Sequence, residues 1–180
     1  MRKLSELEGV CLGIVYKQQP CTAYSVRRAL KESPSSNWQA SAGAVYPALS
    51  RLEDAGLLST TFDESDGRGR KLLEVTATGR QALREWIKAG IDPKMIAAIM
   101  DPIRSRTFFL DVLNIRQQQH YLAQMITLTE AYLEETNTRL AQSPESENLY
   151  AHLGALGATL ATRARLDWLK IVQERINARI

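Results

Sequence analysis

The sequence predicts a mainly α-helical protein with one small β-hairpin, divided into an amino-terminal domain of residues 1–90 and a carboxy-terminal domain of residues 91–180. Three observations predict this fold class. Along most of the chain, apolar residues recur every three or four positions, as on a helix with one buried face. Two β-prone segments of the first half flank the polar stretch DESDGRGR, an arrangement typical of a hairpin. The second half consists of long helical patterns with broad apolar faces.

The composition is that of a globular protein whose first half is mildly basic. Of the 180 residues, 44% are hydrophobic and 24% are charged, which is enough for a core. Residues 1–90 hold 13 Lys and Arg against 10 Asp and Glu, whereas residues 91–180 hold 10 of each, so the net charge of +3 lies in the first half. A surplus this small does not by itself indicate nucleic-acid binding.

No targeting or membrane segment is expected, and we predict a cytoplasmic protein. The amino terminus MRKLSELEGVCLGIVYK has charges within its apolar stretch and no cleavage-site pattern. Eighteen apolar residues never occur in a row. Cys11 and Cys21 lack the spacing of metal ligands, which favours a reducing compartment and structural roles for both thiols.

The first two helices are marked by their capping residues. Ser5 and Glu8 form a capping box ahead of an apolar face. A second helix is expected from about Thr22 to Lys31, with Arg27 and Arg28 on its outward side.

The third helix is predicted in the segment SAGAVYPALSRLEDAGLL, residues 41–58. Ser41 can cap its first amides, and Gly56 can supply a left-handed stop. The outward side of its first turns is low and smooth, formed by Ser41, Ala42, Gly43 and Tyr46. Pro47 lacks an amide hydrogen, so we expect a slight kink or a loosened first turn.

A hairpin and a fourth helix follow. Residues 57–62 and 71–76 suit two strands, and Arg68, Arg70 and Lys71 place cations at the return of the tip. Thr76 can cap the fourth helix. Three short helices followed by a two-stranded wing form the winged helix-turn-helix arrangement, in which the third helix enters the DNA major groove by its amino-terminal end.

These motifs resemble the PadR family of bacterial transcriptional regulators. The family's hallmark is G-x-x-Y-P-x-L-x-x-L-E-x-x-G-L-[IL] with a later L-T-x-x-G segment, here GAVYPALSRLEDAGLL and LEVTATGRQALREW. The similarity covers roughly residues 4–87. Two positions depart from it, because Ala23 stands where members often have glycine and Leu73 where they often have an aromatic residue. The resemblance implies a homodimer on an inverted-repeat operator, frequently a repressor, with some members responding to small aromatic molecules.

We predict the following DNA-contacting residues: Tyr24, Arg27, Arg28, Ser41, Ala42, Gly43, Tyr46, Arg51, Arg68, Arg70 and Lys71. Those of the second helix would pin the phosphate backbone without reading sequence. Two alternatives stay open. Arg51 either contacts a phosphate or serves at the surface, for instance paired with Asp54, and the cations of the hairpin could be a solvated tip.

Capping residues before proline mark three helix starts in the second half, at Asp92, Asp101 and Ser143. They predict a short segment with Met95 to Met100, a helix that includes Phe108 to Leu113, and a last helix of about residues 144–179. Between the last two, a longer helix is expected at about 116–142.

The apolar surface of these helices is too large to be covered by one chain, so a second copy is expected. Burial of ~1,000 Å² of apolar area is worth ~25 kcal/mol before entropy is subtracted. We predict these dimerisation residues: Leu122, Met125, Leu149, Leu153, Leu156, Leu160, Leu169, Val172 and Ile176. Gly154 and Gly157 would let helices approach closely. Tyr132 and Trp168 either line a cavity for a small aromatic effector or belong to the core.

Enzymatic activity, a metal and a cofactor are not expected. His120 and His152 are isolated, and the sequence contains no G-x-S-x-G, Walker A or dinucleotide fingerprint. The sequence therefore predicts a sequence-specific DNA-binding transcriptional regulator, a homodimeric repressor with a small-molecule response. The alternative is a winged-helix adaptor that binds another protein instead of double-stranded DNA.

Overall fold

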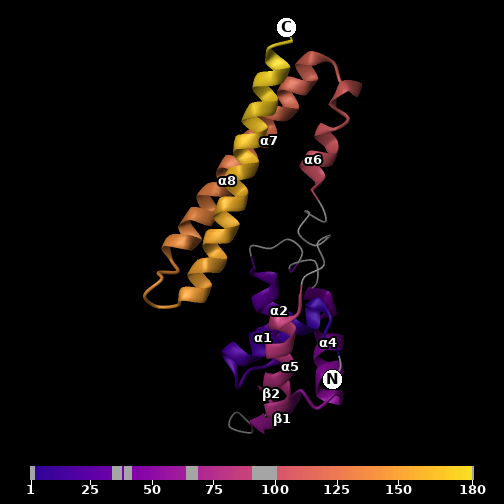
Figure 1. Cartoon of the computed structure of the whole chain (residues 1–180), viewed down its shortest axis with the longest axis vertical. Coiled ribbons are helices and arrows are strands. Elements are labelled where there is room, and N and C mark those ends of the chain that lie inside the picture. The colour runs from indigo at the N-terminus through magenta and orange to yellow at the C-terminus, as the bar shows by residue number, and fades with distance from the viewer. Residues whose placement is uncertain (1–2, 34–37, 39–41, 64–68, 91–100, 180) are drawn as a thin grey trace. The chain divides into compact units, whose positions relative to one another are not determined.

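The computed structural model describes residues 3–33, 38, 42–63, 69–90 and 101–179. The chain divides into two compact units, Met1–Asp92 and Pro93–Ile180. Each unit is described by itself below, with the element labels of Figure 1. Within the described residues, no helix is both long and apolar enough to cross a membrane.

The first unit is built from helices and one hairpin in the predicted order (Figure 1). Its elements are α1 (Glu6–Gln18), α2 (Ala23–Lys31), the 3₁₀ turn η1 (Ala42–Ala44), α4 (Val45–Asp54), β1 (Leu58–Asp63), β2 (Arg70–Val75) and α5 (Ala77–Lys88). The mainly helical fold class with a small hairpin is therefore confirmed. Its core lies among α1, α2, α4, α5 and the hairpin and is almost wholly aliphatic, with Leu12, Val26, Leu30 and Leu52 fully buried.

The predicted caps of the first two helices are present. The Ser5 hydroxyl accepts a hydrogen bond from the Glu8 amide at 3.3 Å, and the Glu8 carboxylate accepts one from the Ser5 amide at 3.0 Å. Thr22 likewise accepts a bond from the Ser25 amide at 3.1 Å. These capping bonds satisfy amides that the first turn of a helix leaves without partners.

The third helix begins later than predicted. Its α-helical part starts at Val45, after the 3₁₀ turn η1, and Ala44 supplies no side-chain cap. Pro47 is thus the third α-helical residue, where a missing amide costs little because the first amides of a helix lack intrahelical acceptors. The 3₁₀ turn is the loosened start that the proline predicts. The predicted cap Ser41 lies outside the described residues.

The hairpin pairs β1 with β2 from Leu58 opposite Val75 to Asp63 opposite Arg70. Cys21 adds an antiparallel bridge to the other edge of β2, because its amide and carbonyl bond to Leu73 at 3.2 and 2.7 Å. The sequence does not predict this bridge. It connects the start of the helix-turn-helix to the wing.

Two glycines and a threonine join α4, β1, β2 and α5. Gly56 has a φ of +69° and ends the third helix as predicted. The Thr76 hydroxyl donates to the Gly56 carbonyl at 2.8 Å and accepts from the Gly79 amide at 2.9 Å. A Cβ on Gly79 would lie 2.1 Å from the Leu57 carbonyl oxygen. The T-x-x-G spacing therefore allows α5 to pack directly on the backbone after α4.

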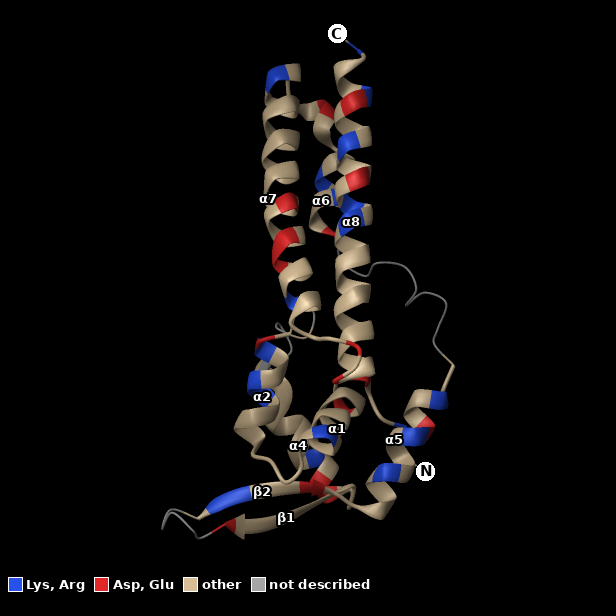
Figure 2. Ribbon diagram, turned by 90° about the vertical axis from the view of Figure 1, so that its left-hand side faces the viewer, with Lys and Arg blue, Asp and Glu red and all other residues tan. Residues whose placement is uncertain are grey.

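The second unit contains α6 (Pro102–Thr107), the 3₁₀ turn η3 (Leu110–Val112), α7 (Ile115–Ala141) and α8 (Leu149–Asn177). The long helices α7 and α8 run side by side (Figures 1 and 2). One end of their interface is apolar, with Leu110, Leu122 and Leu169 in its core. Further along, the interface is lined by four buried threonines, Thr129, Thr136, Thr159 and Thr162.

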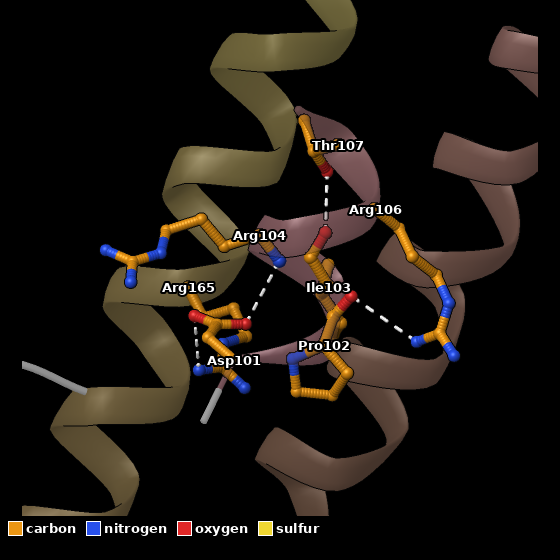
Figure 3. A network of polar contacts seen from close by, with 7 residues as sticks. All are labelled: Asp101, Pro102, Ile103, Arg104, Arg106, Thr107 and Arg165. Atoms are coloured by element: carbon orange, nitrogen blue, oxygen red, sulfur yellow. Dashed lines mark hydrogen bonds and ion pairs between the residues drawn. The ribbon is translucent and has the colours of Figure 1, made fainter. Parts of the chain in front are cut away.

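The start of α6 is fixed by Asp101, as predicted (Figure 3). Its carboxylate accepts a bond from the Arg104 amide at 3.1 Å and pairs with Arg165 of α8 at 2.9 Å. The helix ends at Thr107, however, so the prediction that it continues through Phe108 to Leu113 is wrong. Phe108 and Val112 are more than 80% exposed, whereas Leu110 of the following 3₁₀ turn lies in the core.

The last helix starts five residues later than predicted. Ser143 does not cap it, because residues 144–147 form a turn. Asn148 supplies the cap and accepts a bond from the Ala151 amide at 3.1 Å. The predicted start at Asp92 and the segment from Met95 to Met100 lie outside the described residues.

Candidate nucleic-acid interface

The start of the third helix presents a surface with small side chains. Tyr46 is 50% exposed, and Gly43 is exposed with no described atom within 4 Å of the place that a Cβ would take. The side chain of Ala42 lies outside the described set, as does Ser41. With Val45, Ala48 and Leu49 buried beneath it, this end of the helix offers backbone and one tyrosine to a large ligand.

The second helix places cations beside this surface. It packs against η1 and α4, and Tyr24 on its first turn is 59% exposed. Arg28 is exposed with its guanidinium 4.0 Å from Glu32 on the same helix. Arg27 is half-buried.

The wing supplies a second group of cations. Arg70 and Lys71 open β2 and are both exposed, and Figure 2 shows this basic end of the strand next to the hairpin tip. Arg68 lies outside the described residues. The structure thus keeps two of the three predicted wing cations at the surface, on the strand that returns from the tip.

Arg51 has a structural partner that the sequence does not predict. Its Nε lies 2.9 Å from Oε1 of Glu8, whose side chain is only 4% exposed. The pair joins α1 to α4 across 43 residues. Because the Glu8 charge is buried, Arg51 is required to compensate it, and neither a plain phosphate contact nor a plain surface role describes this residue.

Lys71 also has a partner. Its ammonium lies 2.7 Å from Oε1 and 3.0 Å from Oε2 of Glu53, near the end of α4. The Thr60 hydroxyl donates to the same carboxylate. Glu53 and Glu8 are functional candidates that the sequence analysis missed, although the capping box marked Glu8 as a helix-start residue.

The pKa values of Glu53 and Cys11 are shifted from their ordinary values. Burial opposes ionisation of Glu53, but hydrogen bonds from Lys71 and Thr60 and the Lys71 charge outweigh it and lower the pKa of this carboxyl. Burial, together with the Glu8 charge, raises the pKa of the Cys11 thiol to about 11, against the opposing effect of Arg51. Both cysteines are free and buried, so Cys11 stays a neutral thiol at neutral pH.

The predicted dimerisation residues fall into two groups. Leu122 and Leu169 are fully buried in the core of the second unit of one chain, so they offer no exposed surface to a second copy, and their role in a dimer stays a prediction. Met125, Val172 and Ile176 pack against that same core. In contrast, Leu149, Leu153 and Leu160 are 41%, 50% and 52% exposed on α8, with Leu156 half-buried on the same stripe.

The two aromatic residues predicted for an effector site have different surroundings. Tyr132 lines a pocket of about 280 Å³ between α7 and α8 together with Thr129 and Arg165, whereas Trp168 packs against the core around Leu122 and Leu169. A larger apolar pocket, about 670 Å³, is lined by Pro102, Ser105, Arg106, Phe109, Leu110, Val112, Leu113 and Tyr121. The Tyr121 hydroxyl is buried and has no hydrogen-bond partner among the residues that the structure describes.

Metal binding has no geometric basis in the described part of the chain. Among those residues, no group of three His, Cys, Asp or Glu side chains could hold a metal ion. His152 instead contacts the Ser143 carbonyl through Nδ1 at 2.9 Å, which is a local contact at the turn before α8.

The helices, the wing and their exposed surface define the first unit as a winged helix-turn-helix domain. Residues 11–85 match the family described as the transcriptional regulator PadR-like family. The predicted resemblance is therefore confirmed, and the chain carries a PadR-like domain. That family comprises transcriptional regulators, which agrees with the prediction that the chain is not an enzyme.

Known proteins extend this similarity to both units. The transcriptional regulator Rv3488 of Mycobacterium tuberculosis is 44% identical over 48 residues, which are 27% of this chain and 45% of that protein. The match thus spans less than half the length of that relative. Bacillus subtilis PadR bound to operator DNA has a TM-score of 0.83 at 18% identity, over 96% of this chain and 99% of that one. Bacillus subtilis PadR bound to p-coumaric acid has a TM-score of 0.76 at 20% identity, over 95% and 98%. Identities this low establish the shared fold alone.

Proposed function

We propose that this chain is a cytoplasmic transcriptional repressor that binds an inverted-repeat operator as a homodimer. Residues 1–90 would act as the DNA-binding domain, and residues 91–180 would act in dimerisation and effector sensing. The observation that carries this proposal is the exposed, small-residue start of α4 with Tyr46 at its edge, flanked by the cations of α2 and β2. Support also comes from the operator-bound relative of the same fold.

The chemistry of this surface favours close backbone approach. Gly43 allows the helix start to come near the groove, while Tyr24, Arg27, Arg28 and Arg70 are placed to contact phosphates. Few side-chain donors are available to read bases directly. Sequence preference would therefore depend on Tyr46, on bridging water and on DNA shape.

Dimerisation is supported by the exposed leucines of α8. Leu149, Leu153, Leu156 and Leu160 are spaced by four, three and four residues, which is the spacing of a helix-packing seam. No described atom lies within 4 Å of a Cβ built on Gly154 or Gly157 beside them, so a second helix can approach closely. Two recognition helices could then reach half-sites one or more helical turns apart.

A response to a small aromatic acid is supported by the 670 Å³ pocket of the second unit. Phe109, Leu110 and Leu113 give it apolar walls, while Arg106 provides a cation and the Tyr121 hydroxyl, which has no partner among the described residues, provides a donor. The p-coumaric acid complex of the Bacillus subtilis relative supports this ligand class. To release DNA, such a ligand must bind the DNA-competent and incompetent states with different affinity.

The test is selection of bound duplexes from a random DNA library by the purified protein, with its mass in solution measured in parallel. Recovery of an inverted repeat by a dimer is the expected result. Absence of enrichment even at low salt would contradict the proposal and favour the protein-binding adaptor. Addition of p-coumaric acid to the enriched complex tests the response, since an unchanged affinity would contradict it.

A further inference from the structure

One carboxylate of the third helix contacts both strands of the wing. Glu53 lies in the last turn of α4 and is 22% exposed. Thr60 of β1 donates to one of its oxygens, and the Lys71 ammonium of β2 lies 2.7 and 3.0 Å from its two oxygens. Glu53 therefore links the third helix to both strands of the hairpin.

The strand register shows that these contacts come from one face of the hairpin. Thr60 is opposite Leu73, and Phe62 is opposite Lys71, so these four side chains lie on the same face. Leu73 is 2% exposed and belongs to the core, which identifies this face as the one turned toward the body of the domain. By alternation, Arg70 lies on the opposite face.

We propose that Glu53 is a positioning residue that holds the wing against the recognition helix, and that Lys71 binds Glu53 rather than a DNA phosphate. This inference rests on the proposed function and assigns Lys71 a different role from the sequence analysis. Lys71 also neutralises an anionic group that would otherwise repel DNA. Arg70, on the other face, keeps the phosphate-contacting role.

A double-mutant cycle on affinity for the selected operator tests this proposal. Lys71→Met should weaken binding roughly three- to ten-fold in the parent, whereas in a Glu53→Gln background the same substitution should change affinity less than about two-fold. If Lys71 contacted a phosphate, its loss would cost as much in both backgrounds. That result would overturn the proposal.

Arg27→Met is the matched control, because Arg27 is a predicted phosphate contact on another element. It should cost the same in both backgrounds and lower the slope of log affinity against log salt by about 1. Exchange of the charges of Glu53 and Lys71 distinguishes a positioning role from a purely structural one. The pair Glu53→Lys with Lys71→Glu should bind better than Lys71→Glu alone, and failure of this rescue contradicts the positioning role.

Thermal unfolding of each variant verifies that it is folded when its operator affinity is measured. Thr60→Val removes a second contact to Glu53 without changing charge, and it should weaken operator binding with an unchanged salt slope. Unchanged affinity of Thr60→Val and Lys71→Met would overturn the inference. A parent protein that binds no operator would instead contradict the proposed function.

Discussion

Arg51 and Glu8 form an ion pair that joins the recognition helix to the first helix, with Nε and Oε1 2.9 Å apart. The Glu8 side chain is 4% exposed and that of Arg51 is 50% exposed. A buried carboxylate is stabilising only when its charge is compensated. The pair therefore contributes to the orientation of α4, whose start forms the proposed DNA-binding surface.

Arg51→Met should lower the free energy of unfolding by about 2 kcal/mol, because it leaves a buried charge without its cation in a half-exposed pair. Urea denaturation measures this change. Glu8→Gln is the matched partner, since glutamine preserves the capping box. The double variant should be more stable than Arg51→Met alone. An equal loss of stability in the double variant and in Arg51→Met would contradict the pairing of Arg51 with Glu8.

Gly9 and Gly13 lie four residues apart on α1 but should differ in their tolerance of alanine. A Cβ on Gly9 would lie 2.3 Å from the Trp86 ring, whereas one on Gly13 would be 3.9 Å from Leu83. Gly9→Ala should destabilise the domain by about 2 kcal/mol through overpacking, and Gly13→Ala should stabilise it by up to about 1 kcal/mol through helix propensity. Thermal unfolding of both variants is the measurement, and equal melting temperatures would contradict this packing.

The lowered pKa of Glu53 predicts a pH-dependent contribution to stability. Since the folded pKa lies below the usual 4.5, the contribution is fully present above about pH 4.5 and is lost as the pH falls through the folded value. The pair is partly exposed, so we expect about 0.5–1 kcal/mol. Unfolding of the parent and of Glu53→Gln between pH 3 and 7 should show a stability difference only toward the upper end. A constant difference would contradict the assignment.

The exposed leucines of α8 should control dimerisation without controlling folding. Leu153→Glu and Leu160→Glu should weaken the dimer at least ~10-fold, because each places a charge in an apolar seam. Leu169→Ala should instead lower the free energy of unfolding of the second unit by roughly 2–5 kcal/mol, since Leu169 is fully buried in one chain. Sedimentation and denaturation separate the two effects. Unaltered dimerisation in both glutamate variants would refute this interface.

The sequence predicted features that depend on neighbouring residues. Ser5, Thr22 and Asp101 cap helices as expected, because a capping bond reaches only three residues along the chain. The start of α8 was misplaced because Ser143 and Asn148 are both plausible caps, and only the observed turn decides between them.

Other features depend on contacts that spacing alone does not encode. Glu8 and Arg51 are 43 residues apart, so their pairing follows from the packing of α1 on α4. Similarly, Leu169 and Leu160 are both apolar positions of one helix, but one packs within the chain and the other is exposed. An apolar pattern predicts that a residue is buried, but it does not identify the surface that covers the residue.

The most direct test of the proposed DNA-binding surface is operator affinity of Tyr46→Ala beside Tyr16→Ala. Both tyrosines are about half exposed, at 50% and 48%, but only Tyr46 lies at the start of the recognition helix. With folding verified by thermal unfolding, Tyr46→Ala should weaken binding at least ~10-fold, a loss of about 1.4 kcal/mol, while Tyr16→Ala should bind like the parent. Parent-like affinity of Tyr46→Ala would contradict the central claim that this end of α4 reads DNA.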